Sequence, residues 1–354
     1  MRTALIAWYD RVARDLPWRR TRDPYAIWVS EIMLQQTRVD TVLRYYDRFL
    51  TRFPSAHVLA AASEDEVMAA WSGLGYYRRA RNLHSGVREV VARYGGEVPV
   101  EPEARRALPG VGRYTAGAIG SIAFERAEPI VDGNVARVLC RVLGIDSPPE
   151  HGETARRLWA EAERLVQGPR PSALNQALME LGATVCGKQN PDCARCPLQP
   201  HCRAHADNRT RELPVARKKR PPRTVALVGL LATHGSGAAR QVWLERGDGS
   251  LFGGLWNLPM AEGRGRVIAA ALLAQSGLRG RLAPRPHGTL EHVLTHRKLE
   301  LELWQASSVR PAGAPPDASV RKPVRLTELA ALGVSRLTRK ALAVRLSRAD
   351  GRYT

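Results

Sequence analysis

The hydrophobic pattern of this 354-residue chain changes near residue 203, and that change limits the possible folds more than any other feature. Before it, apolar residues recur at helical spacing, as in Leu5, Trp8, Tyr9 and Val12. After about residue 224, segments such as TVALVGLLAT and LELELW alternate as strands do. We therefore expect a multidomain protein: an all-α domain over residues 1–202, a basic linker over 203–223, and an α+β domain over 224–354.

The chain carries a formal net charge of +20, which indicates a polyanionic partner. Clustered Lys and Arg gain affinity for nucleic acid by releasing the counterions of phosphates. No stretch approaches 18 uninterrupted apolar residues, so we expect no membrane association. The N-terminal segment is charged and amphipathic and has no cleavable apolar core, which favours a cytoplasmic, nucleoid-associated protein.

A glycine-punctuated turn, Leu108-Pro109-Gly110-Val111-Gly112, precedes a helix expected from Arg113 to Phe124. Gly110 and Gly112 can take positive φ without a Cβ clash, so backbone N–H groups can converge at the start of that helix. Such a helix start favours a phosphate oxygen. The alternative is an ordinary corner between two helices.

Two carboxylates are candidates for chemistry. Asp132 stands before the helical run Val135, Val138, Leu139 and Val142, where the helix N-terminus keeps a capping carboxylate ionised and able to stabilise a developing cation. Glu31 lies in a helix that begins at Asp23-Pro24, beside apolar residues that are expected to raise its pKa and let it donate a proton. The alternative for Asp132 is that it only caps its helix. The alternative for Glu31 is that it is a surface residue at the edge of its helix.

Four of the five cysteines, Cys186, Cys193, Cys196 and Cys202, fall within 17 residues. This grouping favours a metal site over a disulfide framework. Zinc fits the ligand type, but the usual zinc pattern pairs two C-x-x-C knuckles and only Cys193 and Cys196 form one. Cys140 is expected to be a small core residue.

LPGVGRYTAGAI followed by DGNVARV, together with WVSEIMLQQT, resembles the helix-hairpin-helix DNA glycosylases of the endonuclease III superfamily, most closely the MutY type. The resemblance implies a monomer that excises adenine opposite 8-oxoguanine or G in double-stranded DNA, in base excision repair. It implies that Glu31 protonates adenine, that Asp132 stabilises the sugar cation, and that Tyr114 and Asn134 support that centre. It assigns a 4Fe-4S cluster to the four cysteines and contacts with DNA or the base to Arg14, Trp18, Arg19, Gln36, Tyr76, Gly110, Gly112 and Gln176.

The C-terminal phrase LFGGLWNLP resembles a Nudix-type fold. The helix RGRVIAAALLAQSG lacks the glutamates with which a Nudix pyrophosphatase holds magnesium, so the resemblance implies an inactive module that recognises the lesion. EHVLTHRKLEL resembles the Phe-Ser-His loop that senses 8-oxoguanine in MutY proteins, with Leu294 and Thr295 in place of Phe and Ser and with His296 matching. Thr295 and His296 are therefore the expected lesion contacts.

Three other functions are alternatives for this sequence. A bifunctional glycosylase and lyase of endonuclease III type, with another base specificity, requires an amine where this chain has Tyr114, and the first lysine of the chain is Lys188. A nucleotide pyrophosphatase requires the missing acidic cluster. A non-catalytic DNA-binding module leaves Glu31 and Asp132 without a joint purpose.

Overall fold

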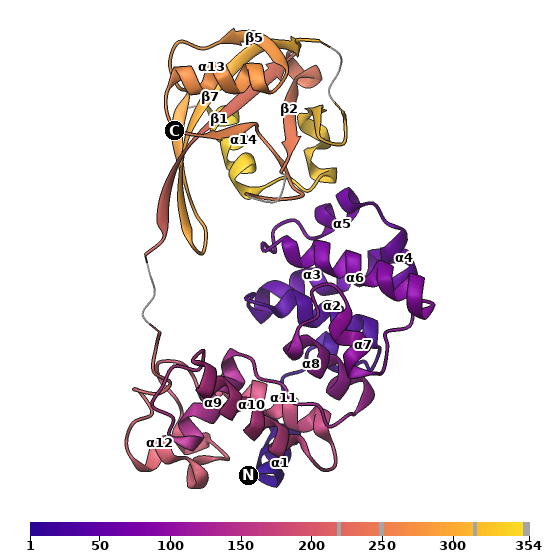
Figure 1. Ribbon diagram of the computed structural model, residues 1–354, viewed down its shortest axis with the longest axis vertical. Coiled ribbons are helices and arrows are strands. Elements are labelled where there is room, and N and C mark those ends of the chain that lie inside the picture. Colours follow the sequence, from indigo (N-terminus) through magenta and orange to yellow (C-terminus); the bar gives the residue numbers. More distant parts are fainter. Residues whose placement is uncertain (218–220, 248–250, 314–316, 350–354) are drawn as a thin grey trace. The chain divides into compact units, whose positions relative to one another are not determined.

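The computed structural model describes residues 1–217, 221–247, 251–313 and 317–349 (Figure 1). The chain divides into two compact units: residues 1–61 with 82–219, and residues 62–81 with 220–354. The domain limits expected from the sequence stay a prediction, and residues 218–220 of the expected linker lie outside the described residues. Among the described helices, none is both long and apolar enough to cross a membrane.

The first unit is helical, as the sequence predicts. Its α-helices are α1 Arg2–Val12, α2 Pro24–Leu34, α3 Val39–Arg52, α4 Ala56–Ala61, most of α6 Arg78–Tyr94, α7 Pro102–Ala107, α8 Arg113–Phe124, α9 Gly133–Leu143, α10 Gly152–Val166, α11 Pro171–Thr184 and α12 Arg203–Ala206. Short 3-10 helices lie at η1 Pro17–Arg19, η2 Cys193–Arg195 and η3 Gln199–His201.

Two helices, α2 and α8, form the centre of this unit. Asp23 caps α2 by accepting from the backbone N–H of Tyr25, and Pro24 occupies the first helical turn, where its missing N–H costs nothing. Residues 25–33 of α2 and 115–122 of α8 are buried at every position, as expected of helices enclosed on all sides. Their contact positions Glu31 beside the start of α8.

A second core joins α1 and α9 to α10 and α11, with the cysteine loop packed against it. Helix α9 begins at the capping residue Asp132 and ends at Gly144, whose φ of 64° is the left-handed conformation that stops a helix. Its apolar stripe includes Val135, Val138 and Leu139, all buried in this core. The N-terminus of α9 is thereby held at a fixed place.

The second unit contains a mixed sheet, which confirms the expected α+β class. Its strands are β1 Arg223–His234, β2 Gln241–Arg246, β3 Trp256–Asn257, β4 Met260–Glu262, β5 Leu278–Leu282, β6 Gly288–Val293, β7 Arg297–Pro311 and β8 Arg321–Arg325. The main order is β3-β2-β1-β7-β5, with β4 on β1, β6 on β7 and β8 on β2. Strands β1 and β7 pair in parallel, and the other named pairs are antiparallel.

Alternation along β1 gives the sheet two apolar faces. Leu227 and Leu231 belong to a core that includes Leu337 of α14 Arg336–Ala349. Val228 and Leu230 belong to a separate core with α13 Arg266–Gln275. Because successive side chains of a strand point to opposite faces, one strand serves both cores.

Residues 62–81 group with the second unit, although they precede most of the helical unit in the sequence. Asp65 of α5 Glu64–Ala70 accepts hydrogen bonds from Trp256 Nε1, at 3.0 Å, and from Arg246 Nη2. Lys322 Nζ lies 3.7 Å from the other oxygen of Asp65, and 4.3 Å from the centre of the Trp256 ring. Such contacts between residues far apart in sequence leave no trace in hydrophobic periodicity.

Candidate active site

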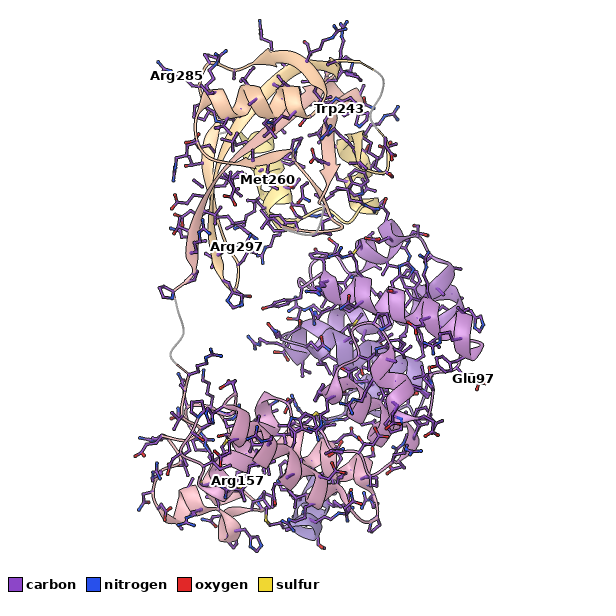
Figure 2. The ribbon with its side chains drawn as sticks, viewed as in Figure 1. Glu97, Arg157, Trp243, Met260, Arg285 and Arg297 are labelled. Carbon is purple, nitrogen blue, oxygen red and sulfur yellow. The ribbon has the colours of Figure 1, made fainter. Side chains whose placement is uncertain are left out.

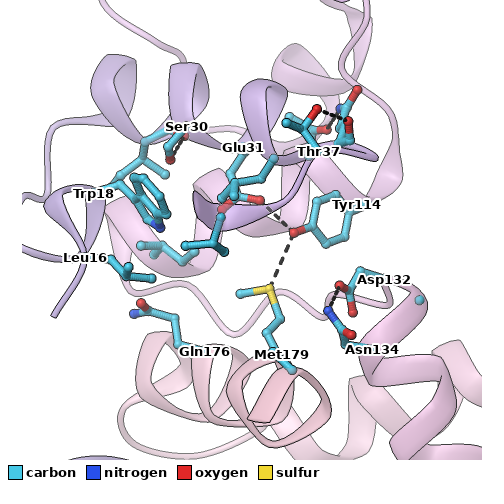
Figure 3. A pocket seen from close by; sticks show the side chains of 18 of the residues that line it. Leu16, Trp18, Ser30, Glu31, Thr37, Tyr114, Asp132, Asn134, Gln176 and Met179 are labelled. Atoms are coloured by element: carbon cyan, nitrogen blue, oxygen red, sulfur yellow. Dashed lines mark hydrogen bonds between the residues drawn. The ribbon is translucent and has the colours of Figure 1, made fainter. Parts of the chain in front are cut away.

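A cavity of about 700 Å³ opens in the first unit between α2, α8, α11 and the start of α9 (Figure 3). Most of the residues singled out from the sequence line this cavity. They are Arg14, Trp18, Arg19, Glu31, Gln36, Gly110, Gly112, Tyr114, Asp132, Asn134 and Gln176.

Glu31 lies in the cavity wall with only 4% of its surface exposed. Burial raises the pKa of its carboxyl to about 7, despite the hydrogen bond from Tyr114, which lowers it. The hydroxyl of Tyr114 donates to Oε2 of Glu31 at 2.7 Å. A carboxyl with this pKa is partly protonated near neutral pH, so it can serve as a proton donor.

Asp132 caps α9 and faces the same cavity. Its Oδ1 accepts from the backbone N–H of Val135 at 2.7 Å, and its Oδ2 accepts from Nδ2 of Asn134 at 3.0 Å. Burial raises the pKa of Asp132, while both hydrogen bonds oppose that rise by stabilising the carboxylate. The cavity therefore holds two carboxyl groups in different surroundings, one whose pKa lies near neutral pH and one whose two oxygens both accept hydrogen bonds.

Tyr114, at the start of α8, connects Glu31 to the opposite wall. Its hydroxyl lies 3.5 Å from Sδ of Met179 on α11 as well as within hydrogen-bond distance of Glu31. Burial, reinforced by the charge of Glu31, raises the pKa of Tyr114 well above its usual value, so the phenol stays neutral. Figure 3 shows the hydroxyl of Tyr114 joined by dashed lines to Glu31 and to Met179.

Glu180 is the counter-ion of both predicted pocket arginines. It is buried and accepts from Arg14 at 2.7 and 2.9 Å and from Arg19 at 2.8 Å. Burial alone would raise the pKa of Glu180, but these hydrogen bonds lower it to about 2. The position of Glu180 one turn after Gln176 is the signal in the sequence that it faces the pocket.

Arg137, which the sequence analysis did not single out, lies behind Asp132. It donates to Oδ1 of Asn134 at 2.8 Å and to the carbonyl oxygens of Gly182 and Cys186, at 2.7 and 2.9 Å. Asn134 is thus held from both sides. An arginine in a basic chain is no signal by itself, and its role here depends on partners that are remote in sequence.

The glycine turn before α8 needs positive φ at one position and not at the other. Gly110 has φ 77°, and a Cβ there would lie 2.6 Å from Cβ of Asn82. Gly112 is extended, with φ −83° and ψ 179°, so its expected use of positive φ is wrong. A Cβ on Gly112 would meet no atom within 4 Å, which leaves the start of α8 open.

Trp18 and Gln36 occupy different settings at the cavity. Trp18 is buried in η1 and packs edge-on against Tyr46, with ring centres 5.4 Å apart. Gln36 is exposed in the turn after α2, with φ 55°. Its side chain is therefore free of the core, as a residue that inserts into a duplex must be.

The remaining predicted contacts belong to the second unit. Tyr76 is 47% exposed at φ 49°, with the guanidinium of Arg79 5.2 Å from its ring centre. Thr295 and His296 are exposed in the turn between β6 and β7. Figure 2 labels Arg297, which follows this turn. The assigned roles of these residues stay predictions.

Cys186, Cys193, Cys196 and Cys202 line one small cavity together with Arg141. Arg141 is buried and donates to Sγ of Cys186 at 3.1 Å, to the carbonyl of Gly187 at 2.7 Å and to that of Leu213 at 2.8 Å. Within the described ranges, no three His, Cys, Asp or Glu side chains converge on one point as a single metal ion requires. The donor set, four thiols around a common space, fits an iron–sulfur cluster.

Two family models match the chain. Residues 29–164 match "HhH-GPD superfamily base excision DNA repair protein", and residues 234–344 match "NUDIX domain". A thermostable thymine-DNA glycosylase of known structure is 31% identical with a TM-score of 0.53, over 58% of this chain and 95% of that one. The chain belongs to the HhH-GPD superfamily of base excision DNA repair proteins.

Curated relatives confirm the resemblance to the MutY type within that superfamily. An adenine DNA glycosylase of Rattus norvegicus is 53% identical over 213 residues, which are 58% of this chain and 41% of the relative. One of Arabidopsis thaliana is 41% identical over 296 residues, 73% of this chain and 47% of the relative. The chain thus spans about half the length of these curated relatives.

Proposed function

We propose that this protein is an adenine DNA glycosylase that hydrolyses the N-glycosidic bond of adenine paired with 8-oxoguanine or G in duplex DNA. The observation that supports it most is the pair of carboxyl groups in one cavity, Glu31 with a pKa raised to about 7 and Asp132 hydrogen-bonded as an anion. Departure of a protonated base through a cationic sugar needs one group of each kind. The names of the relatives agree with adenine as the excised base.

Adenine inside a duplex is out of reach, so the base must be extruded, at a cost of a few kcal/mol. The cavity, at about 700 Å³, has room for one base. Glu31 then donates its proton to adenine and makes it a better leaving group. Asp132 stabilises the positive charge that develops on the sugar, and water completes the hydrolysis.

The reaction is expected to stop at the abasic site. A lyase step requires an amine that attacks the sugar carbon, and Tyr114 offers a neutral phenol at the position where the lyases of the superfamily are expected to have lysine. Tyr114 instead holds Oε2 of Glu31 in place. The protein is therefore proposed to be monofunctional.

Residues at the rim of the cavity are proposed to contact the DNA backbone and to fill the gap that the extruded base leaves in the duplex. The open start of α8 at Gly112 presents free backbone N–H groups to a phosphate. The exposed Gln36 is the proposed wedge. A net charge of +20 favours the same partner, and the protein is proposed to act on it as a monomer, bound to the nucleoid in the cytoplasm.

We also propose that Cys186, Cys193, Cys196 and Cys202 hold one 4Fe-4S cluster, since they line a common cavity. When bound, the cluster would cross-link the loop that carries it, and would leave no open ligand position for hydrolysis. Anaerobically purified protein should contain about four irons per chain and absorb visible light. Stoichiometric zinc with no visible absorbance would contradict the cluster.

The second unit is proposed to recognise 8-oxoguanine. Thr295 and His296 are exposed in the β6–β7 turn, where side chains are free to contact a partner base. In a Nudix pyrophosphatase the corresponding helix is expected to carry the catalytic acids. Helix α13 of this protein has the sequence RVIAAALLAQ, which contains no Asp or Glu. Recognition rather than pyrophosphate hydrolysis is the function that these residues support.

One assay separates the proposal from its rivals. The protein is incubated with a duplex that carries A opposite 8-oxoguanine, and product strands are analysed before and after alkali. A monofunctional glycosylase leaves strands intact until alkali cleaves the abasic site. Cleavage without alkali, with an adduct trapped efficiently by borohydride, would indicate the lyase; intact strands after alkali would indicate a non-catalytic DNA-binding module.

A further inference from the structure

Gln176, on α11, lines the cavity with a side-chain amide that could face a base in either of two orientations. Its amide has an acceptor, Oε1, beside a donor, Nε2. Adenine has a 6-amino donor next to a ring-nitrogen acceptor, whereas hypoxanthine and guanine have an acceptor oxygen at position 6. The amide therefore matches adenine only when Oε1 faces position 6. Rotated by a half turn, the same amide would favour a 6-oxo purine.

Two side chains behind Gln176 hold the amide in one orientation. The hydroxyl of Tyr9 donates to Oε1 at 3.1 Å, and Nε2 of Gln176 donates to Oγ of Ser172 at 3.1 Å. Oγ of Ser172 also accepts from Nη1 of Arg22, at 3.0 Å. Neither Tyr9 nor Ser172 is among the residues lining the cavity. After these bonds, Oε1 keeps a second lone pair and Nε2 a second N–H, both available to a base.

Tyr9 is itself fixed by its surroundings. It is 9% exposed on α1, within a core shared with α11. The guanidinium of Arg19, which Glu180 binds, lies 5.3 Å from the centre of its ring. Burial raises the pKa of the phenol, so the hydroxyl keeps its proton and remains a donor. The donor on Oε1 is therefore permanent over the working pH range.

We propose that Tyr9 is a positioning residue for base selection: its hydroxyl holds Oε1 of Gln176 toward the 6-amino group of an extruded adenine. This inference rests on the proposed function and adds to it the origin of the preference for a 6-amino purine. Tyr9 does not touch the base and acts through Gln176. Removal of the Tyr9 hydroxyl should then slow the release only of bases that carry a 6-amino group.

The test compares Tyr9→Phe with wild type in single-turnover assays at saturating enzyme. The two duplexes carry either adenine or unsubstituted purine, which lacks the 6-amino group, opposite 8-oxoguanine. Each variant rate is divided by the wild-type rate on the same duplex, which cancels the intrinsic difference between leaving groups. Tyr9→Phe should slow adenine release about fivefold to tenfold, as loss of one hydrogen-bonding constraint does. Purine release should change by less than about twofold.

Tyr25→Phe is the matched control. Its hydroxyl is also buried and donates to the carbonyl of Phe53 at 2.9 Å, and Tyr25 does not line the cavity. This variant can lower stability but should scale both rates equally. In a Gln176→Met background, which removes the amide, Tyr9→Phe should have no further effect on adenine release.

Several results would overturn the inference. Equal slowing of adenine and purine by Tyr9→Phe would make the tyrosine merely structural. An undiminished effect in the Gln176→Met background would show that it does not act through the amide. A wild-type protein that releases neither base overturns the proposed function and this inference with it, whereas active wild type with an unselective Tyr9→Phe overturns the inference alone.

Discussion

Glu31 and Asp132 are proposed to perform opposite tasks, because their surroundings differ. Glu31 is buried beside one phenol, and burial raises its pKa to about 7, whereas Asp132 receives two hydrogen bonds at the N-terminus of α9. A desolvated carboxyl favours its protonated form, and a helix start favours an anion. The same functional group, a carboxyl, can therefore serve as acid and as electrostatic stabiliser in one cavity.

The pH dependence of base release follows from the proton on Glu31. In the proposed mechanism Glu31 donates from its protonated form, which is lost as the pH rises through its pKa of about 7, so the single-turnover rate should fall above that pH. The hydrogen bond from Tyr114 lowers this pKa, so Tyr114→Phe should raise it and move the fall to higher pH. A pH–rate profile of both proteins measures the shift, and a fall that moves to lower pH would contradict the assignment.

The settings of individual site residues could be predicted from the sequence, but their hydrogen-bond partners could not. The cap at Asp132 could be predicted because it precedes a helical apolar run, and the burial of Glu31 because apolar residues surround it. The hydrogen bond between Tyr114 and Glu31 joins residues 83 positions apart, and that between Tyr9 and Gln176 joins residues 167 apart. No local pattern encodes such contacts, which depend on how α1, α2, α8 and α11 pack.

At the scale of elements, the glycine turn before α8 shows which of its glycines the backbone requires. The sequence predicted two equivalent glycines, but only Gly110 has positive φ, and only there would a Cβ meet a neighbour closely. Gly112 instead leaves the helix start uncovered. Spacing alone could not separate a conformational need from a need for open space, because both select glycine.

Gly110→Ala should destabilise the protein by about 1–2 kcal/mol, the usual cost of placing a side chain in the left-handed region, with the contact to Asn82 adding to it. Gly112→Ala is the matched control, because its backbone is extended and its Cβ has room, and it should lose less stability than Gly110→Ala, only about the 0.5 kcal/mol by which a helix N-cap prefers Gly to Ala. Unfolding in urea measures both. Equal losses for the two variants would show that the turn does not depend on the φ of Gly110.

At the scale of the whole molecule, the change in periodicity predicted a helical part followed by an α+β part, and both classes are confirmed. The grouping of residues 62–81 with the second unit could not be predicted. It depends on contacts of Asp65 with Trp256 and Arg246, which lie 191 and 181 residues after Asp65 in the sequence. Tyr76 and His296, the two expected contacts near the lesion, therefore belong to one unit.

The second unit should set the preference for 8-oxoguanine over G opposite the adenine. His296→Ala should reduce the ratio of the two excision rates by about fivefold, since one hydrogen bond contributes on the order of 1 kcal/mol. His234→Ala, which removes another exposed histidine of this unit, should leave the ratio unchanged. If His296→Ala weakens binding to both duplexes equally and keeps the ratio, the turn adds only affinity.

The most direct measurement is single-turnover release of free adenine from a duplex with A opposite 8-oxoguanine, by wild type, Asp132→Asn and Glu31→Gln. Asn keeps an oxygen that can cap α9 at Val135, so this variant should fold and bind DNA while losing the negative charge. We expect each variant to be slower than wild type by at least about 10²-fold, as losses of transition-state stabilisation or of a proton donor are. Release of adenine at near the wild-type rate by either variant would contradict the roles assigned to this pair of carboxyl groups.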